Sequence, residues 1–405
     1  MKVAAIIAEY NPFHNGHKYQ IDRIRETLGK DCAVIAIMSG NYTQRGELAI
    51  TDKAFRAEAA CNCGVNLVLE LPFPFSMSSA EFFATAGVRI ANSLGIVDYL
   101  VFGSESGNID ELADIAEISL SEEFLLTVED MSGSDDYKSK GYPEICEAAI
   151  KRLYGKEFSS NFFSPNNILA IEYIKAIRRE KSNTIPVTFS RVGAGYNDSL
   201  KENTPFQSAS GIRADFLSSG VSALDYVPFS ARSIFLTAEK EGKFPSDATI
   251  LDTAVIAHFR LNSPARCDDI HDAAGGLYNR LCDISAKVSS ISSLTSKTET
   301  KKYTKARIRR AIWNSYFGVT SSDVRANPAY TQVLAMDDIG KSLLKSIKKT
   351  ANIAVITKPS SYIEYGDEVI RQAELSHKAD SVYGLTLKVP NLGTSSLTFT
   401  PYVKK

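Results

Sequence analysis

Two histidines flank an Asn-Gly pair in the stretch AAIIAEYNPFHNGHKYQI near the start of a chain that has five histidines in all. We expect a helix to begin near Asn15 or Gly16, because the proline just before the pair disfavours helix ahead of it; His14 and His17 are then about one turn apart. A helix N-terminus offers free N–H groups and a positive dipole end, imidazoles add directed donors, and glycine permits close approach. The spacing therefore predicts an anion site, best suited to phosphate.

Two other interpretations of these histidines stay open. They could be structural residues with satisfied ring nitrogens. They could also supply two zinc ligands as H-x-x-H, but the glutamate of H-E-x-x-H is missing and no third ligand is evident nearby. We therefore predict no metal site.

The elements that must position these residues are short apolar strands alternating with amphipathic helices. Near-continuous apolar strands between helices indicate an α/β fold, a doubly wound parallel sheet covered on both faces. In that architecture ligands bind beyond the carboxyl ends of the strands, where the histidine motif lies. The expected strands are 3–9, 32–40, 66–72, 98–105 and 185–192, and the expected helices are 17–28, 52–64, 80–95 and 166–180.

Length and composition indicate a second domain. A chain of 405 residues is long enough for more than one domain. We expect a nucleotide domain at 1–225 and a mainly helical C-terminal domain at 226–405, with strands returning at 351–358 and 384–390. No apolar run reaches the ~18 residues of a membrane span, and the start does not resemble a signal peptide. Six cysteines without a framework spacing predict reduced thiols and a cytoplasmic protein.

Charged segments are candidates for contact with an anionic partner such as nucleic acid. The net charge of −1 argues against a chain that coats nucleic acid, but it allows a local basic patch. The best such patch interleaves the aromatics of KKYTKARIRRAIWNSYFG with Lys301, Lys302, Lys305, Arg307, Arg309 and Arg310. It could equally be a solvated helix face. Arg45 and Lys53, after the second strand, are candidates for contact with an anionic ligand, with a solvated loop as the alternative.

Here the sequence resembles a known superfamily. H-x-G-H after the first strand of a Rossmann-like sheet is the signature of the HIGH-type nucleotidyltransferases, whose later Ser/Thr-rich turn ending in Arg is matched by SASGIR (208–213). A closer resemblance is to the bacterial tRNA(Met) cytidine acetate ligase family, through IIAEYNPFHNGH, SGNYTQRGE, LVLELPFPFS, FGSE, SPNNILAIEYIKAI, RVGAGYND and SASGIR, in that order. The resemblance is dense from residue 3 to about 216 and sparser beyond.

The resemblance implies a set of site residues. His14 and His17 would stabilise charge at the α-phosphate of ATP, and Ser208, Ser210 and Arg213 would hold the leaving pyrophosphate. Simple N-capping by the serines and a surface ion pair of the arginine are the alternatives. The implied ATP contacts are Ile7, Ala8, Glu9, Tyr10, Asn11, Pro12, Phe13, His14, Asn15, Gly16, His17, Gly103, Asn166, Arg191, Ser208 and Ser210. For Gly103, Asn166 and Arg191 the alternatives are a turn glycine, a helix N-cap and a surface ion pair.

The resemblance also implies a reaction. Members of the family use ATP, with Mg²⁺ expected alongside it, and acetate to form N4-acetylcytidine in elongator tRNA(Met) through acetyl-adenylate. Neither a membrane nor DNA is an expected partner. Departures at Gly211 and Asn197 from residues common in the family put substrate positioning in doubt rather than the reaction class. The alternatives are a nucleotidyltransferase acting on another small acid or phosphate ester, and a non-catalytic tRNA-binding protein.

Overall fold

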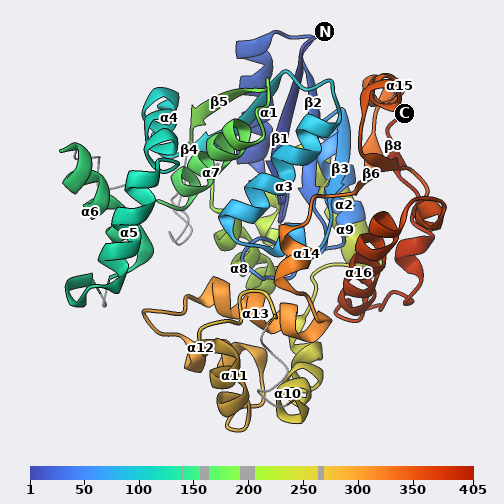
Figure 1. Ribbon diagram of the computed structural model, residues 1–405. Coiled ribbons are helices and arrows are strands. Elements are labelled where there is room, and N and C mark those ends of the chain that lie inside the picture. The colour runs from blue at the N-terminus through green and yellow to red at the C-terminus, as the bar shows by residue number, and fades with distance from the viewer. Residues whose placement is uncertain (138–139, 156–163, 192–205, 263–268) are drawn as a thin grey trace.

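A computed structural model of the chain describes residues 1–405 except 138–139, 156–163, 192–205 and 263–268. Its centre is an eight-stranded sheet in the order β5-β4-β1-β2-β3-β6-β7, with β8 paired to β6 (Figure 1). The strands from β5 to β3 run parallel, and β6 pairs antiparallel with β3. The strand bounds are β1 Val3–Ala8, β2 Ala33–Ser39, β3 Leu67–Leu71, β4 Tyr99–Ser104, β5 Ile185–Ser190, β6 Tyr330–Met336, β7 Ala354–Ile356 and β8 Tyr402–Val403.

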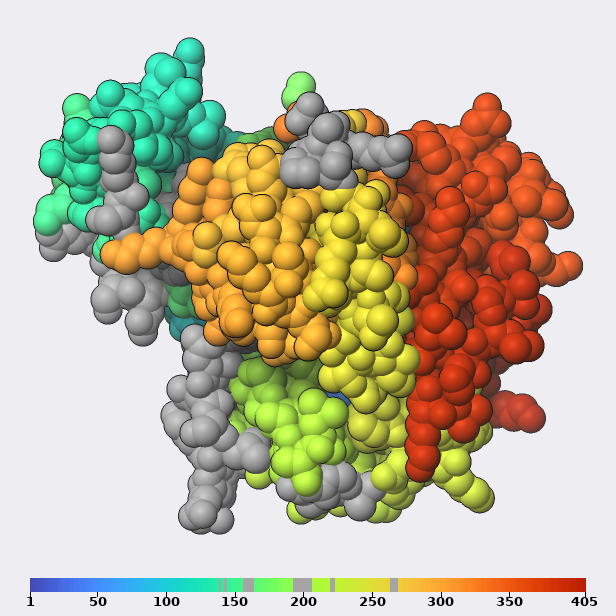
Figure 2. All heavy atoms as spheres, turned by 90° about the horizontal axis from the view of Figure 1, so that it is seen from below, coloured from blue at the N-terminus to red at the C-terminus, as the bar shows by residue number. Residues whose placement is uncertain are grey.

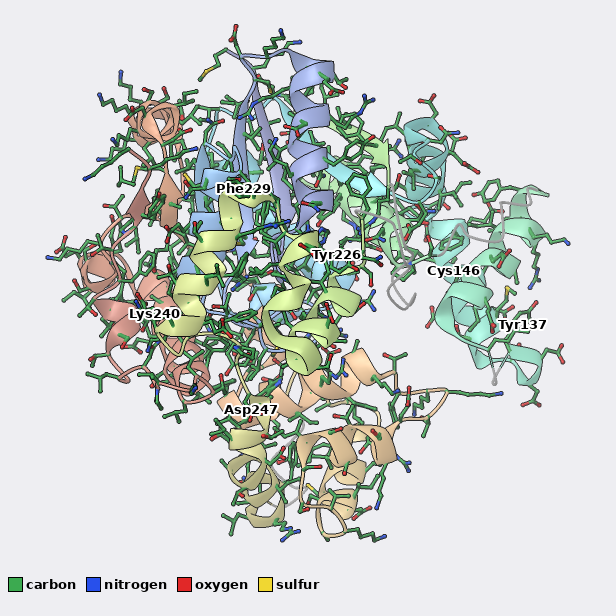
Figure 3. All side chains as sticks on the ribbon, turned by 180° about the vertical axis from the view of Figure 1, so that it is seen from behind. Tyr137, Cys146, Tyr226, Phe229, Lys240 and Asp247 are labelled. Carbon is green, nitrogen blue, oxygen red and sulfur yellow. The ribbon has the colours of Figure 1, made fainter. Side chains whose placement is uncertain are left out.

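Helices cover both faces of the sheet, as its apolar strands require. On one face α1 (Asn15–Leu28), α2 (Lys53–Asn62), α8 (Ala209–Ser219) and α9 (Phe229–Lys240) pack over β1 and β2. On the other face lie α3 (Ala80–Ser93), α4 (Ile109–Ile118) and α7 (Pro165–Arg179), while α5 (Glu122–Gly133) and α6 (Tyr142–Tyr154) pack on each other and extend to one side of the sheet (Figure 1). Figure 3 shows α9 crossing the back of the sheet from Phe229 to Lys240, before the chain passes Asp247.

The remaining helices form a lobe at the carboxyl ends of the strands and a C-terminal segment at the sheet edge. The helical lobe comprises α10 (Asp252–Leu261), α11 (Leu277–Ser285), α12 (Ile291–Thr298), α13 (Lys305–Phe317) and α14 (Ser321–Arg325). Then α15 (Asp338–Thr350) packs on β3 and β6, and α16 (Asp367–Gly384) packs on the lobe. From below, the yellow and orange lobe covers much of this end of the molecule beside the red C-terminal segment (Figure 2).

The expected strands and helices of the first half are confirmed, but the second half differs from expectation. Strand β6 was missed because Thr331 and Gln332 interrupt its apolar run. The expected strand at 384–390 is wrong: α16 ends at Gly384, and the following residues form turns in which Thr386 Oγ1 donates to the carbonyl of Tyr383. Because β6 pairs with β3, the expected division between 1–225 and 226–405 cuts across one continuous sheet.

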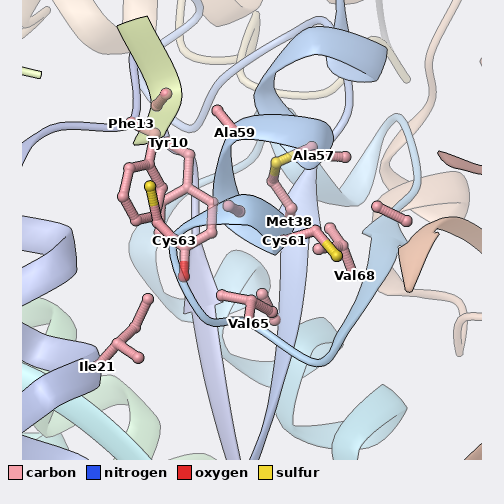
Figure 4. Packing of buried hydrophobic residues seen from close by; sticks show 14 of the residues in the cluster. Tyr10, Phe13, Ile21, Met38, Ala57, Ala59, Cys61, Cys63, Val65 and Val68 are labelled. Carbon is pink, nitrogen blue, oxygen red and sulfur yellow. The ribbon is translucent and has the colours of Figure 1, made fainter. Parts of the chain in front are cut away.

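Two further findings concern cysteines and membranes. Cys32, Cys61 and Cys63 are free thiols, as expected, and Cys61 and Cys63 lie among apolar side chains in the core (Figure 4). Cys267 lies outside the described residues. Within the described part of the chain, no helix has the length and apolar character needed to cross a membrane.

Candidate active site

The loop from the end of β1 into α1 is anchored on the core side. Tyr10 and Phe13 are buried, and their rings pack edge to face at a centroid distance of 4.9 Å (Figure 4). Arg56, a fully buried residue of α2, donates to the carbonyls of Glu9 at 2.6 Å and Ser39 at 3.1 Å, which fall at the carboxyl ends of β1 and β2. These contacts hold the backbone that carries the histidine motif.

The two histidines form the N-cap of α1, which begins at Asn15 as expected. His14 is the N-cap residue; its Nδ1 accepts from the Gly16 N–H at 3.0 Å, and the Nδ1 of His17 accepts from the His14 N–H at 3.2 Å. This arrangement is a capping box built from histidines. The two rings stack at a centroid distance of 3.8 Å. Each ring is therefore held in place by the helix terminus itself.

These hydrogen bonds also determine the charge and tautomer of both rings. A nitrogen that accepts from a backbone N–H carries no proton, so each neutral ring bears its proton on Nε2. Burial, reinforced by Arg191 and Arg213, lowers the pKa of His14 to about 3. Burial and the adjacent ring lower the pKa of His17 well below its ordinary value. Both histidines therefore present a neutral Nε2–H donor.

Gly16 is required by the position of the His14 ring. A Cβ at residue 16 would lie 2.9 Å from His14 Cε1 and 3.0 Å from its Nδ1. Such distances are shorter than van der Waals contact, so any larger residue would displace the ring. The glycine of H-x-G-H thus allows the first histidine to fold back over the helix terminus.

The motifs FGSE and SPNN interlock beside the histidines. The Glu105 carboxylate accepts from Asn166 Nδ2 at 2.6 Å and from the Asn167 N–H at 2.8 Å, and the buried Asn167 Oδ1 accepts from the Glu105 N–H at 2.9 Å. Asn166 Oδ1 in turn accepts from Arg191 Nη1 at 3.0 Å. Asn166 is not the N-cap of α7, which is Ser164, so the N-cap alternative is wrong.

Gly103 lies where the stem of Arg191 crosses the end of β4. A Cβ at residue 103 would meet Arg191 Cγ at 3.1 Å, tighter than ordinary contact. The Arg191 N–H donates to the carbonyl of Ser104 at 3.0 Å. Gly103 and Arg191 therefore form one surface at the ends of β4 and β5.

The SASGIR motif caps α8 and supports the histidine loop. Ser208 is buried and its Oγ accepts from the Gly211 N–H at 3.1 Å, so the N-capping alternative is confirmed for this serine. The Oγ atoms of Ser208 and Ser210 lie 3.2 Å apart. Arg213 donates to the carbonyl of Asn11 at 2.9 Å and to Glu47 at 2.7 Å. Its role at the pyrophosphate stays a prediction.

Two adjoining cavities share His14, His17, Gln20, Gly103 and Arg191. The smaller, of about 610 Å³, extends past Phe189, Ser190, Phe206 and Gln207. The larger, of about 1130 Å³, is lined by Ile7 through Asn11 and by Asn166 and Ser208. Of the expected ATP contacts, Phe13 lies instead in the core, and Asn15 Nδ2 donates to the carbonyl of Asp225 at 3.4 Å.

Much of the basic segment makes internal contacts. Arg310 is buried against Asp272, with Nε–Oδ2 at 2.6 Å; Arg309 contacts Glu47 at 2.5 Å; and Arg307 donates to the carbonyls of Asp272 and Ala274. The aromatic Trp313 is buried as well and donates to the carbonyl of Gly46 at 3.1 Å. The segment therefore does not form one exposed basic and aromatic face, and its contact with RNA stays a prediction. Lys301, Lys302 and Lys305 remain at the surface.

Lys53 is likewise held by internal contacts, and it lines neither of the two cavities beside the histidines. It is buried, and its Nζ contacts Glu70 at 2.7 Å and Asp380 at 2.6 Å. Arg45 lines the larger cavity, as a contact to acetate or phosphate requires. Arg45 thus lies beside the histidine site and Lys53 does not, and the role of each at a ligand stays a prediction.

Three charged residues that connect the elements around the site were not identified from the sequence: Glu47, Glu105 and Arg56. Glu47 joins Arg213 to Arg309, and Glu105 joins β4 to α7. Their partners lie far away in the sequence, so no local pattern reveals them. The one feature of the sequence that could have indicated them is a charged residue within an otherwise apolar segment or within a motif.

The parallel sheet with a histidine-capped helix at its carboxyl edge defines a nucleotidyltransferase of the HIGH class, and the family model described as HIGH Nucleotidyl Transferase matches residues 1–395. The tRNA(Met) cytidine acetate ligase of Acetivibrio thermocellus is 34% identical and covers 99% of both chains. That of Caldanaerobacter subterraneus is 36% identical over 98% of both. The chain belongs to this family of tRNA(Met) cytidine acetate ligases.

Solved structures agree with this assignment. Thermotoga maritima TmcAL bound with alpha-thio ATP is 29% identical, with a TM-score of 0.90 and full coverage of both chains. The apo form of the same protein is 30% identical with a TM-score of 0.92, covering 100% of this chain and 99% of the other. The fold similarity therefore extends over the helical lobe and the C-terminal segment.

Proposed function

We propose that the chain is an ATP-dependent ligase that joins acetate to the wobble cytidine of elongator tRNA(Met), forming N4-acetylcytidine. The observation that carries this proposal is the pair of neutral histidines, His14 buried and His17 half-buried, that line adjoining cavities at the carboxyl ends of the strands and use Nδ1 for the backbone. The names of the relatives and the ATP-analogue complex of the Thermotoga protein support the choice of substrates.

In the first step, an acetate oxygen attacks the α-phosphorus of ATP. A new O–P bond forms, the bond to the bridging oxygen breaks, and pyrophosphate leaves, giving acetyl-adenylate. Phosphoryl transfer of this kind needs positioning and charge stabilisation from the protein rather than covalent chemistry. The Nε2–H groups of His14 and His17 would donate to oxygens of the α-phosphate, and the N-terminus of α8 would favour the departing pyrophosphate.

In the second step, the exocyclic amine of cytidine attacks the acetyl carbon. The C–N bond forms, the C–O bond to the adenylate breaks, and AMP leaves with the electron pair while the amine loses a proton. The cytidine must be unstacked to reach the cavity. We expect Lys301, Lys302 and Lys305, on the lobe at the same end of the sheet, to contact the tRNA backbone.

Mg²⁺ would accompany ATP rather than occupy a protein cage. Among the described residues, no group of three or more His, Cys, Asp or Glu side chains could hold a metal ion. Mg²⁺ is commonly held through substrate phosphates with few protein ligands. When bound it would neutralise phosphate charge; the donors that the chain itself supplies are the imidazoles and helix termini.

The test is incorporation of radiolabelled acetate into tRNA with ATP, together with acetate-dependent exchange of pyrophosphate into ATP. We expect His14→Ala and His17→Ala to lower both rates on the order of 10²–10³-fold, as loss of a transition-state donor does. The matched control is His377→Ala, because His377 contacts Ser396 away from both cavities. Circular dichroism and thermal unfolding establish that the variants are folded.

The outcomes separate the proposal from its alternatives. Label in one cytidine of elongator tRNA(Met), lost in both site variants and kept in the control, supports the ligase. Exchange of pyrophosphate with another acid but not with acetate would replace it by a general adenylyltransferase. Binding of tRNA without any exchange would indicate a non-catalytic protein.

A further inference from the structure

The inner end of the larger cavity differs in chemistry from the part that adjoins the histidines. Its wall is formed by Phe83 of α3, Phe102 of β4, and Leu169 and Tyr173 of α7. Helices α3 and α7 pack side by side on the same face of the sheet (Figure 1). The cavity therefore joins the histidine site to an apolar recess formed by residues of α3, β4 and α7.

One polar atom in this recess lacks a partner. Tyr173 is 3% exposed, and its ring packs on that of Phe102 at a centroid distance of 5.4 Å. Its hydroxyl has no hydrogen-bond partner among the described residues. A buried hydroxyl without a partner carries an uncompensated desolvation cost, which a bound ligand would remove. Burial also raises the pKa of Tyr173, so the phenol remains a proton donor.

The hydroxyl of Tyr10 differs in its surroundings from that of Tyr173. Its hydroxyl also lacks a partner among the described residues, and Tyr10 lines the same cavity. However, that hydroxyl lies beside Cys63 in the core (Figure 4), close enough for the thiol to raise the pKa of Tyr10. Of the two tyrosines, Tyr173 is the one that belongs to the apolar recess.

The charged groups around the recess suit a small carboxylate. Arg45 lines the cavity and lies close enough to Glu9 to lower the pKa of that carboxyl group. Glu9 accepts from the Gln44 N–H at 2.8 Å, which holds the loop carrying Arg45 over the cavity. Burial raises the pKa of Glu9, and Arg45 and Arg213 oppose its charge, so repulsion of a second carboxylate is reduced.

We propose that this recess is the acetate subsite, with Tyr173 and Arg45 donating to the acetate carboxylate and Phe83, Phe102 and Leu169 surrounding its methyl group. The inference rests on the proposed function and adds to it the residues that select the acid. In this position the carboxylate faces the side of the cavity that holds His14 and His17. Leu169 then limits the length of the acyl chain, and Tyr173 acts as a positioning residue for the attacking oxygen.

Two substitutions test the two parts of the subsite. Tyr173→Phe removes the donor but keeps the ring, so the KM for acetate should rise on the order of tenfold or more while the KM for ATP stays unchanged. Tyr42→Phe is the matched control, because Tyr42 is equally buried, its hydroxyl also has no partner among the described residues, and it lies outside this cavity. Acetate-dependent pyrophosphate exchange measures all of these constants.

Leu169→Ala should create room for one more methylene. The ratio of kcat/KM for propionate to that for acetate should rise on the order of tenfold, within the range by which pockets discriminate a methylene. Because this is a gain in activity, unfolding cannot imitate it. Leu126→Ala, an exposed position on α5, provides the control substitution.

The possible failures are distinguishable. A wild-type chain without acetate-dependent exchange overturns the proposed function, and the subsite with it. An active wild-type chain whose Tyr173→Phe variant keeps its acetate KM, and whose Leu169→Ala variant keeps its acyl preference, overturns the subsite alone. A shift in either constant, with both controls unchanged, supports the assignment.

Discussion

At the scale of single residues, the site depends on two imidazoles whose Nδ1 atoms are used by the backbone. A helix usually obtains its N-cap from Ser, Thr, Asp or Asn. Here His14 and His17 provide both halves of the capping box, so the two residues of the proposed site also have a structural role. The structural interpretation of the two histidines is therefore compatible with the proposed one. The fold uses Nδ1 of each ring and leaves Nε2–H to donate to a ligand.

Gly16→Ala should disturb this arrangement without unfolding the protein. The new methyl group would lie 2.9 Å from His14 Cε1, so the ring must shift by several tenths of an ångström. We expect pyrophosphate exchange to fall on the order of 10²-fold, as for loss of a well-placed donor. Gly366→Ala, where no atom lies within 4 Å of the added methyl, is the control. Equal rates in both variants would contradict the role given to Gly16.

The depressed pKa of His14 predicts a pH-dependent stability. Unfolded His14 titrates near 6.5 and folded His14 near 3, so the unfolded chain binds the proton first as the pH falls. The free energy of unfolding should therefore decrease from about pH 6.5 toward pH 3, by up to about 1.4 kcal/mol per pH unit for this group. Urea unfolding at several pH values should show a shallower decline in His14→Gln. Parallel curves would contradict it.

At the scale of elements, Glu105 joins the end of β4 to the start of α7. Its carboxylate accepts two N–H groups at the N-terminus of α7 and holds the Asn166 side chain. This use of a remote carboxylate replaces the side-chain cap that Ser164 does not provide. The position of Asn166, and through it that of Arg191, thus depends on a residue of another strand.

Glu105→Gln should weaken this connection. The amide keeps one acceptor but removes the negative charge at the helix N-terminus, so we expect a loss of about 1 kcal/mol in stability. The KM for ATP should rise several-fold, because Asn166 and Arg191 are no longer held in place. Glu122→Gln, in the first turn of α5, is the matched control. Thermal unfolding and exchange kinetics measure the two effects, and an unchanged KM would rule out the positioning role.

The elements around the site differ in how far the sequence predicts them. The start of α1 was predictable because a proline, a glycine and the apolar spacing act within a few residues. The pairing of Glu105 with Asn167 joins positions 62 residues apart, and Glu47 reaches Arg309 across 262 residues. The internal contacts of the basic segment 301–310 could not be predicted, because its acidic and carbonyl partners, such as Asp272, come from other segments.

At the scale of the whole molecule, the core of the helical lobe includes side chains from the loops that follow β2 and β3 of the sheet. Tyr42, in the loop after β2, packs edge to face on Trp313 of α13 at 5.5 Å, and Phe73, after β3, packs on Phe317 at 5.3 Å. Glu47 joins the nucleotide site to α13 through Arg213 and Arg309. The loop that carries Arg45 is thus held between the two halves of the chain.

These contacts, together with the pairing of β6 with β3, predict that the chain unfolds as one unit and that residues 1–225 alone do not fold. Without β6, the edge of β3 would expose unpaired backbone, and the buried Val68 and Leu69 would lose their partners Ala335 and Val333. We expect one calorimetric transition for the full chain and an aggregated or molten fragment at 1–225. A fragment with dispersed amide resonances and its own cooperative transition would instead establish two independent domains.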